Sequence, residues 1–406
     1  MSNVLMNTYH RLPVTFASGE GSWLFDINGK KYLDFGSGIA VNILGHNYPP
    51  LIRAVTQQAA KYLHICNYYM SDTSSAFAEA LVEATAPAGM KNVFLCNSGA
   101  EANEGACKLA RKYSLLKYGT GRHTIVTLKG SFHGRTITTL SATGQDKFHK
   151  DFGPFTEGFV HIAGGDIEAL ERALDAKTVA GLLIEAVQGE GGIVAQDNGY
   201  IAAAAKLCEE RDILLMFDEI QCGLGRTGTF LALEQYKDTD GNPLKADIVT
   251  LAKGLAGGIP AGAVLAGKKA CNVFAEGDHG STFGGNPVAA AAGLVVLKTI
   301  NDPSFLSEIA RKGELIKNTL MQNPKIKEVR GRGMMIGFDI EAASWLILKA
   351  GIARADLSKD LCGLLMLSAG SNTLRMLPPY TISDNEIEQG LSIVSELLDA
   401  NLASFS

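Results

Sequence analysis

The 406-residue sequence lacks an excess of basic side chains, because 37 Lys and Arg stand against 42 Asp and Glu, giving a net charge of −5. Proteins that bind nucleic acids or membrane surfaces generally present a basic face to the phosphate groups of their partners. We therefore expect no nucleic-acid partner and no membrane partner. Any anion site in this chain must be a local cluster.

Long apolar runs and paired cysteines are also missing. No stretch of 18 apolar residues occurs, and the segment 1–11 has no apolar secretory core. The seven cysteines are scattered, without a C-x-x-C pair and without a His/Cys group spaced for a metal. This pattern predicts reduced, buried thiols, no metal site and a soluble cytoplasmic protein.

The composition, 46% hydrophobic and 19% charged, is typical of a compact soluble protein. We expect a large domain at 51–303, a smaller α/β C-terminal domain at 304–406, and an N-terminal segment at 1–50 that packs with the small domain. In the small domain, the apolar pattern predicts strands at 329–340 and 364–367.

Two apolar runs, 213–217 and 248–252, end abruptly in opposite charges, Asp218 and Lys253. Such runs are typical of buried parallel strands, and open α/β sheets bind ligands beyond the carboxyl ends of their strands. A lysine and a carboxylate at that edge suggest pyridoxal phosphate, which needs an amine for its aldehyde and an acid for its pyridine nitrogen. The ordinary alternative is a buried Asp–Lys salt bridge.

A second motif follows the strand expected at 93–96, where Ser98 and Glu101 have the spacing of a helix capping box. The first N–H groups of a helix attract anions, and the small residues Gly99 and Ala100 would let a phosphate reach them. The alternative is a simple helix cap.

The loop 130–136 places Phe132, His133 and Arg135 between glycines, directly after a strand expected at 124–128. An aromatic or imidazole ring could lie on a planar cofactor, and the guanidinium offers paired donors to a carboxylate. The alternative is a polar loop with one anchored aromatic side chain.

Two further loops and one residue in a predicted strand, Arg375, are candidates for binding. The stretch 223–228 matches G-x-G-x-x-G, but it is separated from its strand and does not open a helix, so we reject a dinucleotide site. Hydroxyl groups between glycines at 281–287 could complete a phosphate site, or could form a turn before a helix. Arg375, before two prolines, could bind substrate or form a structural salt bridge.

Taken together, these motifs resemble the class III, fold type I aminotransferases in order and spacing along nearly the whole chain, and within that family the acetylornithine aminotransferases. The matching segments are Gly38 to Asn42, Ser98 to Glu101, Phe132 to Thr136, Asp218 to Gln221, Lys253 with Gly254, and Ser281 to Pro287. The chain departs from the commonest family pattern at Ala186, where proline is usual, and at Cys222, where threonine is usual.

The resemblance implies a large domain with a mainly parallel sheet, a smaller C-terminal domain and a homodimer with shared active sites. It implies that Lys253 forms the Schiff base and shuttles the proton, that Asp218 holds the pyridine nitrogen, and that Phe132 stacks on the ring. The implied cofactor-binding set is Ser98, Gly99, Ala100, Phe132, His133, Asp218, Gln221 near the phenolic oxygen, Lys253 and, from the neighbouring subunit, Thr282.

For the substrates, the resemblance implies Arg135 and Ser281 as contacts of the amine. It also suggests that Glu190 pairs with Arg375 in the first half-reaction and releases it for glutamate in the second. The alternative is a permanent ion pair without influence on specificity.

The implied reaction is transamination of an ω-amine, N-acetylornithine, with 2-oxoglutarate, giving N-acetylglutamate semialdehyde and glutamate in arginine biosynthesis. Ornithine, succinylornithine and 4-aminobutyrate transaminases share the same residues and remain alternatives. A decarboxylase or aminomutase with this cofactor would use the same lysine, whereas a non-catalytic regulator on the fold would be expected to have lost Lys253 or Asp218.

Overall fold

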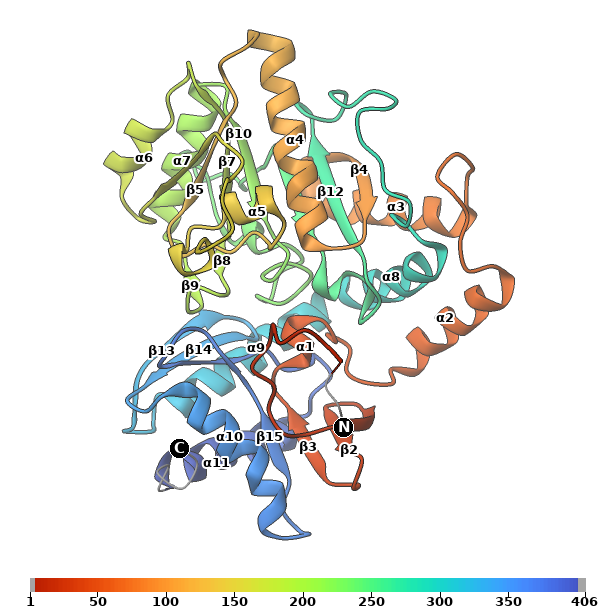
Figure 1. Cartoon of the computed structure of the whole chain (residues 1–406), viewed down its shortest axis with the longest axis vertical. Helices are drawn as coiled ribbons and strands as arrows, with labels where there is room; N and C mark the ends of the chain where they lie inside the picture. The colour runs from red at the N-terminus through yellow and green to blue at the C-terminus, as the bar shows by residue number, and fades with distance from the viewer. Residues whose placement is uncertain (1–3, 401–406) are drawn as a thin grey trace.

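The structure is a computed structural model that describes residues 4–400. Figure 1 shows an upper part, which contains a large sheet with its helices, and a lower part. The lower part combines strands from the beginning of the chain with helices and strands from its end.

The central sheet has seven strands in the order β4-β12-β11-β10-β7-β5-β6. Strands β11, β10, β7, β5 and β6 run parallel, whereas β12 is antiparallel to both of its neighbours. The expected mainly parallel sheet is therefore confirmed, as are parallel neighbours at 213–217 and 248–252. The strands are β4 (Met90–Cys96), β5 (Thr124–Leu128), β6 (Phe159–Ile162), β7 (Val179–Ile184), β10 (Leu214–Asp218), β11 (Ile248–Leu251) and β12 (Gly262–Gly267).

Side chains of β10 alternate between the two faces of this sheet, both of which are covered. Leu214 and Met216 belong to the apolar cluster of helix α4 (Gly99–Tyr118), while Leu215 and Phe217 belong to the larger cluster on the other face. Because the side-chain period of a strand is two, Asp218 falls on the α4 face.

Helices surround the sheet: α7 packs on β10 and α6, and α8 packs on α2, α3 and the turn η4. Helix α3 was not predicted, because its buried face carries only two large apolar side chains, Phe77 and Leu81. Strand β6 and helix α6 were not predicted either, since both are too short to show a clear period. The helices are α2 (Pro49–Lys61), α3 (Asp72–Thr85), α5 (Ile137–Ala142), α6 (Ile167–Ala173), α7 (Asn198–Glu210) and α8 (Pro287–Ile300), with turns η1 (Ala86–Ala88), η2 (Asp146–Phe148), η3 (Ala232–Gln235) and η4 (Lys253–Ala256).

The lower part holds two four-stranded sheets, β1-β2-β3-β15 and β13-β14-β17-β16, and the separate two-stranded sheet β8-β9 contacts β13 through β9. Its strands are β1 (Phe16–Glu20), β2 (Trp23–Asp26), β3 (Lys31–Asp34), β13 (Ile326–Arg332), β14 (Met335–Ile340), β15 (Gly363–Leu365), β16 (Leu367–Ser368) and β17 (Thr373–Met376). The remaining elements are β8 (Val187–Gln188), β9 (Val194–Ala195), α1 (Ser37–Ala40), α9 (Pro303–Leu320), α10 (Ser344–Leu357) and α11 (Asp384–Asp399).

Two strand predictions in this region are wrong. The stretch 329–340 is not one strand but parts of β13 and β14, which reverse direction at Gly333 with φ +51°. The apolar pattern continues through the turn at Met334 and hides the reversal. The stretch 364–367 is divided between β15 and β16, which belong to different sheets.

We propose the expected division of the chain into segments 1–50, 51–303 and 304–406. It is supported by the parallel pairing of β3 with β15, which joins the N-terminal strands to the C-terminal part. Sedimentation of a fragment comprising 51–303 would test whether that segment folds by itself.

The glycine-rich loop 223–228 lies between the two parts and contains the fully buried Arg226, which is 1% exposed. Its Nη1 donates to the carbonyl oxygens of Met334 at 3.0 Å and Pro378 at 2.7 Å. The backbone N–H of Met334 donates back to the Arg226 carbonyl at 3.0 Å. The loop therefore ties the end of β10 to the C-terminal part, a role unrelated to a dinucleotide.

All seven cysteines are free, and five are buried. The prediction of buried thiols is wrong for Cys66, which is exposed, and for Cys271, which is half-buried. Between residues 4 and 400, no helix is both long and apolar enough to cross a membrane. The same residues contain no group of three or more His, Cys, Asp or Glu side chains placed to hold a metal ion.

Helix α9 and the β13–β14 turn touch through backbone at Gly313, where a Cβ would lie 2.0 Å from the Gly333 carbonyl oxygen. We predict that Gly313→Ala lowers the free energy of unfolding by about 1–3 kcal/mol, because rigid backbone must move to admit the methyl group. Asn318→Ala on an exposed position of the same helix is the control and should change it by about 0.5 kcal/mol at most. Urea unfolding measures both, and a Gly313→Ala protein as stable as the wild type would contradict the prediction.

Candidate active site

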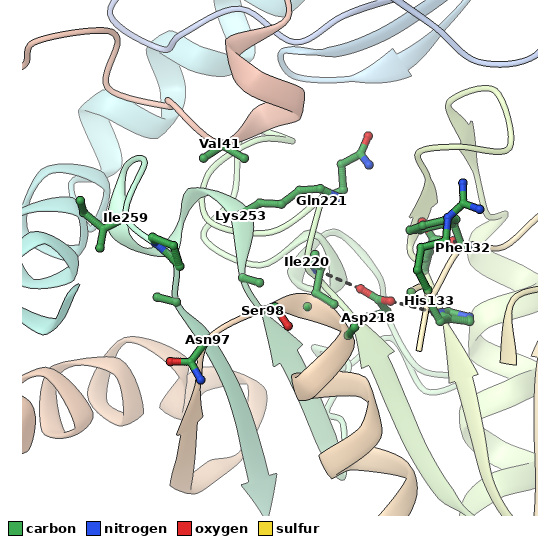
Figure 2. A pocket seen from close by; sticks show the side chains of 18 of the residues that line it. Val41, Asn97, Ser98, Phe132, His133, Asp218, Ile220, Gln221, Lys253 and Ile259 are labelled. Carbon is green, nitrogen blue, oxygen red and sulfur yellow. Dashed lines mark hydrogen bonds and ion pairs between the residues drawn. The ribbon is translucent and has the colours of Figure 1, made fainter. Parts of the chain in front are cut away.

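A cavity of about 430 Å³ opens at the carboxyl ends of β10 and β11, within the roughly 300–1,000 Å³ range of small-molecule sites. Figure 2 shows side chains from several elements around it, with Asp218 beside His133. The edge of the sheet is the one at which open α/β sheets bind ligands. The lining residues are Val41, Asn97, Ser98, Gly99, Ala100, Phe132, His133, Gly134, Arg135, Glu185, Asp218, Ile220, Gln221, Ala252, Lys253, Gly258, Ile259, Pro260 and Ala261.

Asp218 is the last residue of β10 and is 3% exposed. Its Oδ2 accepts hydrogen bonds from Asn103 Nδ2 at 2.7 Å and contacts His133 Nδ1 at 2.8 Å, while its Oδ1 accepts from the Ile220 N–H at 3.0 Å. These hydrogen bonds offset the loss of water around the buried carboxyl group. The arrangement holds one negative charge at the cavity wall.

Lys253 is the first residue of η4, two positions after β11, and it lines the same cavity. Its backbone has φ +45°, a conformation that non-glycine residues rarely adopt and that is concentrated at functional sites. Burial lowers the pKa of its amine, although the charges of Asp218, Glu190 and Glu185 oppose that change. A lowered pKa makes the neutral, reactive form of the amine easier to reach.

Helix α4 begins at the cavity, and the Ser98 hydroxyl caps it by accepting from the Glu101 N–H at 3.2 Å. In a complete capping box, the Glu101 carboxylate would accept from the N–H of Ser98. Here it accepts instead from the N–H of Asn97, at 2.7 Å. The N–H groups of Gly99 and Ala100 precede the first intrahelical bond, which the Ala102 N–H donates to the Ser98 carbonyl at 3.0 Å. These groups can receive a phosphate.

The loop after β5 brings Phe132, His133 and Arg135 to the cavity. The Arg135 guanidinium lies over the ring of Phe148 at 4.0 Å and over that of Phe132 at 5.5 Å. Glu185 accepts from the Phe132 N–H at 2.8 Å and so holds the base of the loop. Burial, followed by the charge of Asp218, raises the pKa of Glu185 to about 7.

Arg375 on β17 is 3% exposed and reaches the edge of the site from the C-terminal part. Its Nη1 forms an ion pair with Glu190 Oε1 at 2.8 Å and donates to Gln221 Oε1 at 3.2 Å. Its Nη2 donates to the Ser368 carbonyl at 3.0 Å. The residues expected to form a charge pair are therefore in contact, and Gln221 joins this pair to the cavity.

Ser281 and Thr282 do not line this cavity within one chain. They line a second one of about 780 Å³, together with Cys66 and Tyr68. Ser281 Oγ accepts from Asn97 Nδ2 at 3.0 Å, and Asn97 is part of the first cavity. The role expected for Thr282 from a neighbouring subunit remains a prediction.

The sequence analysis missed Asn103, which is fully buried and touches Asp218. The available signal was an amide one helical turn after Gly99, beside the apolar positions Ala102 and Ala106. Thr250 was missed as well, although it is the register partner of Asp218 on β11.

The chain matches the family model of class-III aminotransferases over residues 4–398, so it belongs to this family of pyridoxal phosphate-dependent aminotransferases. It is 44% identical over 397 residues to the acetylornithine aminotransferase of Haemophilus ducreyi, covering 98% of this chain and 97% of that protein. It is 46% identical over 400 residues to the acetylornithine aminotransferase of Caldanaerobacter subterraneus, covering 97% of each.

The chain is also similar to solved structures of aminotransferases. The N-acetylornithine aminotransferase of Stenotrophomonas maltophilia has a TM-score of 0.82 and 34% identity, with 98% of both chains covered. The ornithine aminotransferase of Toxoplasma gondii has a TM-score of 0.86 and 32% identity, covering 98% of this chain and 92% of that one.

The cavity residues fit pyridoxal phosphate. The helix N-terminus at Gly99 offers free N–H groups, Lys253 offers an amine, and Asp218 offers a buried carboxylate. His133 Nε2 is buried without a hydrogen-bond partner among the described residues, so the site holds polar capacity that the protein alone does not use.

We predict that Lys253→Ala abolishes the borohydride-reducible bond between protein and cofactor and ends multiple turnover, because the variant has no amine for the aldehyde at this position. Lys61→Ala, at the exposed end of α2, is the control and should behave as the wild type. Peptide mapping after reduction locates the modified residue. A bond at another lysine in the Lys253→Ala protein would contradict the assignment.

Proposed function

We propose that the enzyme transaminates N-acetylornithine with 2-oxoglutarate, giving N-acetylglutamate semialdehyde and glutamate in arginine biosynthesis. The names of the relatives at 44% and 46% identity support this substrate. The observation that carries the proposal is the contact of Arg375 with Glu190, since a neutralised arginine permits an amine that has no carboxylate beside its reacting carbon.

A second candidate is ornithine, which the similarity to the Toxoplasma gondii ornithine aminotransferase favours. Succinylornithine and 4-aminobutyrate present the same kind of terminal amine. These substrates differ mainly in the end that lies far from the reacting amine.

The substrate proposal predicts the order of catalytic efficiencies in a panel of ω-amines. With 2-oxoglutarate as acceptor, kcat/KM for N-acetylornithine should exceed that for ornithine and 4-aminobutyrate by at least about tenfold, or about 1.4 kcal/mol of transition-state binding. Coupled assay of glutamate formation measures the ratios. A higher kcat/KM for ornithine than for N-acetylornithine would contradict the proposal and favour ornithine as the substrate.

The proposed roles follow from the positions of the side chains. Pyridoxal phosphate, when bound, supplies an electron-poor ring that accepts the electron pair of the carbon bearing the amine. Gly99 and Ala100 would bind its phosphate through their N–H groups, with Ser98 as cap, and Phe132 would lie against its ring.

The proton movements are assigned to two residues. Asp218 would keep the ring nitrogen protonated. The Lys253 amine, whose pKa burial lowers, would remove the proton from the substrate carbon and return it. Arg135 and Ser281 are the proposed contacts of the amine substrate.

We also propose a cytoplasmic homodimer in which Thr282 of one subunit reaches the phosphate in the other. Exposed apolar side chains beside the second cavity support a subunit contact, with Tyr68 at 96% and Phe283 at 58% exposure. Sedimentation equilibrium measures the subunit number, and a fully active monomer would contradict the proposal. Cell fractionation tests the location.

The contact of Glu190 with Arg375 predicts opposite effects on the two half-reactions. Arg375→Ala should slow the glutamate half-reaction by roughly 2–5 kcal/mol in barrier and largely spare the amine half-reaction, because only glutamate needs the exposed guanidinium. Glu190→Ala should instead leave Arg375 uncovered and shift preference toward α-amino acids.

Single-turnover rates of each half-reaction distinguish these outcomes. Arg354→Ala, which removes an ion pair with Glu396 between α10 and α11, is the matched control and should leave both rates unchanged. If Arg375→Ala and Glu190→Ala slow both halves equally, the pair is structural and the two residues leave the substrate site.

A further inference from the structure

A buried hydrogen-bond network behind the cavity is not used by the roles proposed above. Asn103, on α4, and Thr250, on β11, are both 0% exposed. Thr250 is paired in register with Asp218 on the neighbouring strand, and Ile248, two residues earlier, packs with the α4 cluster. The alternation of the two strands therefore turns both Asp218 and Thr250 toward the helix that carries Asn103.

Every polar atom of the Asn103 side chain is used. Its Nδ2 donates one hydrogen bond to Asp218 Oδ2 at 2.7 Å and the other to the His133 carbonyl at 2.8 Å. Its Oδ1 accepts from Thr250 Oγ1 at 2.8 Å. A flipped amide would turn its oxygen toward two acceptors, so Asp218 and the His133 carbonyl fix the orientation of the amide, and the Thr250 hydroxyl satisfies and holds its oxygen.

The hydrogen-bond network limits the rotation of the Asp218 carboxylate. Two donors, Asn103 and His133, converge on Oδ2, and Oδ1 keeps only the Ile220 N–H. Rotation of the carboxylate would leave the buried amide of Asn103 without its acceptor, at a cost of roughly 1–3 kcal/mol. Asn103 also lies one helical turn after Gly99, so a single rigid helix sets both the anion-binding N–H groups and the acid.

We infer that Asn103 is a positioning residue for the reaction, one that orients the Asp218 carboxylate, and that Thr250 holds the Asn103 amide in place. The inference rests on the proposed role of Asp218 toward the ring nitrogen. The other titratable side chains that line the cavity are His133, Arg135, Glu185 and Lys253. The hydrogen bonds of the Asn103 side chain go to the Asp218 carboxylate, the His133 backbone carbonyl and Thr250, so its substitution acts on the acid through Asp218.

The test measures the ring nitrogen directly, by the ¹⁵N chemical shift of bound pyridoxal phosphate labelled at that atom. The variants are Asn103→Leu, which removes both donors, and Asn103→Asp, which keeps the acceptor for Thr250 but places a second carboxylate beside Asp218. Thr250→Val removes the hydroxyl at nearly constant shape, and Thr250→Ser restores it. Asp218→Asn is the reference for a ring nitrogen that has lost its acid.

The matched control is Thr85→Val. Thr85 is also 0% exposed and uses its hydroxyl within the protein, donating to the Leu81 carbonyl at 2.8 Å, but it lies on α3 outside the cavity. It reports the cost of removing a buried hydroxyl without any effect on the acid. Thermal unfolding of the cofactor-free proteins is measured for all variants.

We expect the ¹⁵N shift of Asn103→Leu and Asn103→Asp to move toward that of Asp218→Asn, and kcat to fall about 10- to 100-fold, the size typical of partners that orient a reactive group. Thr250→Val should show the same change to a smaller extent, Thr250→Ser should recover the wild-type shift, and Thr85→Val should alter stability alone.

Two results would overturn the inference. One is a wild-type ¹⁵N shift in Thr250→Val and in whichever Asn103 variants fold, even with lowered stability, because the network would then be structural only. The other is a failure of Thr250→Ser to recover the shift lost in Thr250→Val. A wild-type shift in Asp218→Asn itself would instead refute the proposed role of the acid, so the two failures are distinguishable.

Discussion

The burial of the Asp218 carboxylate is the interaction on which the arrangement of the site depends. At 3% exposure, an anion without partners would carry a large desolvation penalty. Its donors come from three elements: α4 through Asn103, the loop after β5 through His133, and the turn after β10 through Ile220. Because all three must reach one residue, they fix how helix, loop and sheet meet.

The same principle of charges matched across elements extends to the edge of the site. Arg375 belongs to the C-terminal part, yet its guanidinium finds a carboxylate on Glu190 and an amide on Gln221, both of which follow strands of the upper part. The buried Arg226 ties the segment just after β17 to the loop beyond β10 through the Pro378 carbonyl. The edge of the cavity is therefore coupled to how the two parts of the chain are held together.

Much of this could be predicted from the sequence, since apolar runs ending in Asp218 and Lys253 indicated buried strands and placed both residues at one edge. The capped start of α4 was also evident, because small residues beside a capping serine are a local signal. Asn103 and Thr250 could not be found in this way, because their role comes from the packing of α4 on the sheet. The reversal at Gly333 was hidden by an apolar pattern that continues across the turn.

The pairing of β3 with β15 constrains the order in which the parts of the chain can fold. Strand β3 leaves the ribosome early, whereas its parallel partner lies close to the other end of the chain. A contact across so long a loop forms late, because the entropy of closing the loop must be overcome first. Every residue that lines the cavity, from Val41 to Ala261, precedes β15 in the chain. A nascent chain therefore carries the whole lining of the cavity before the sheet of β3 can be completed.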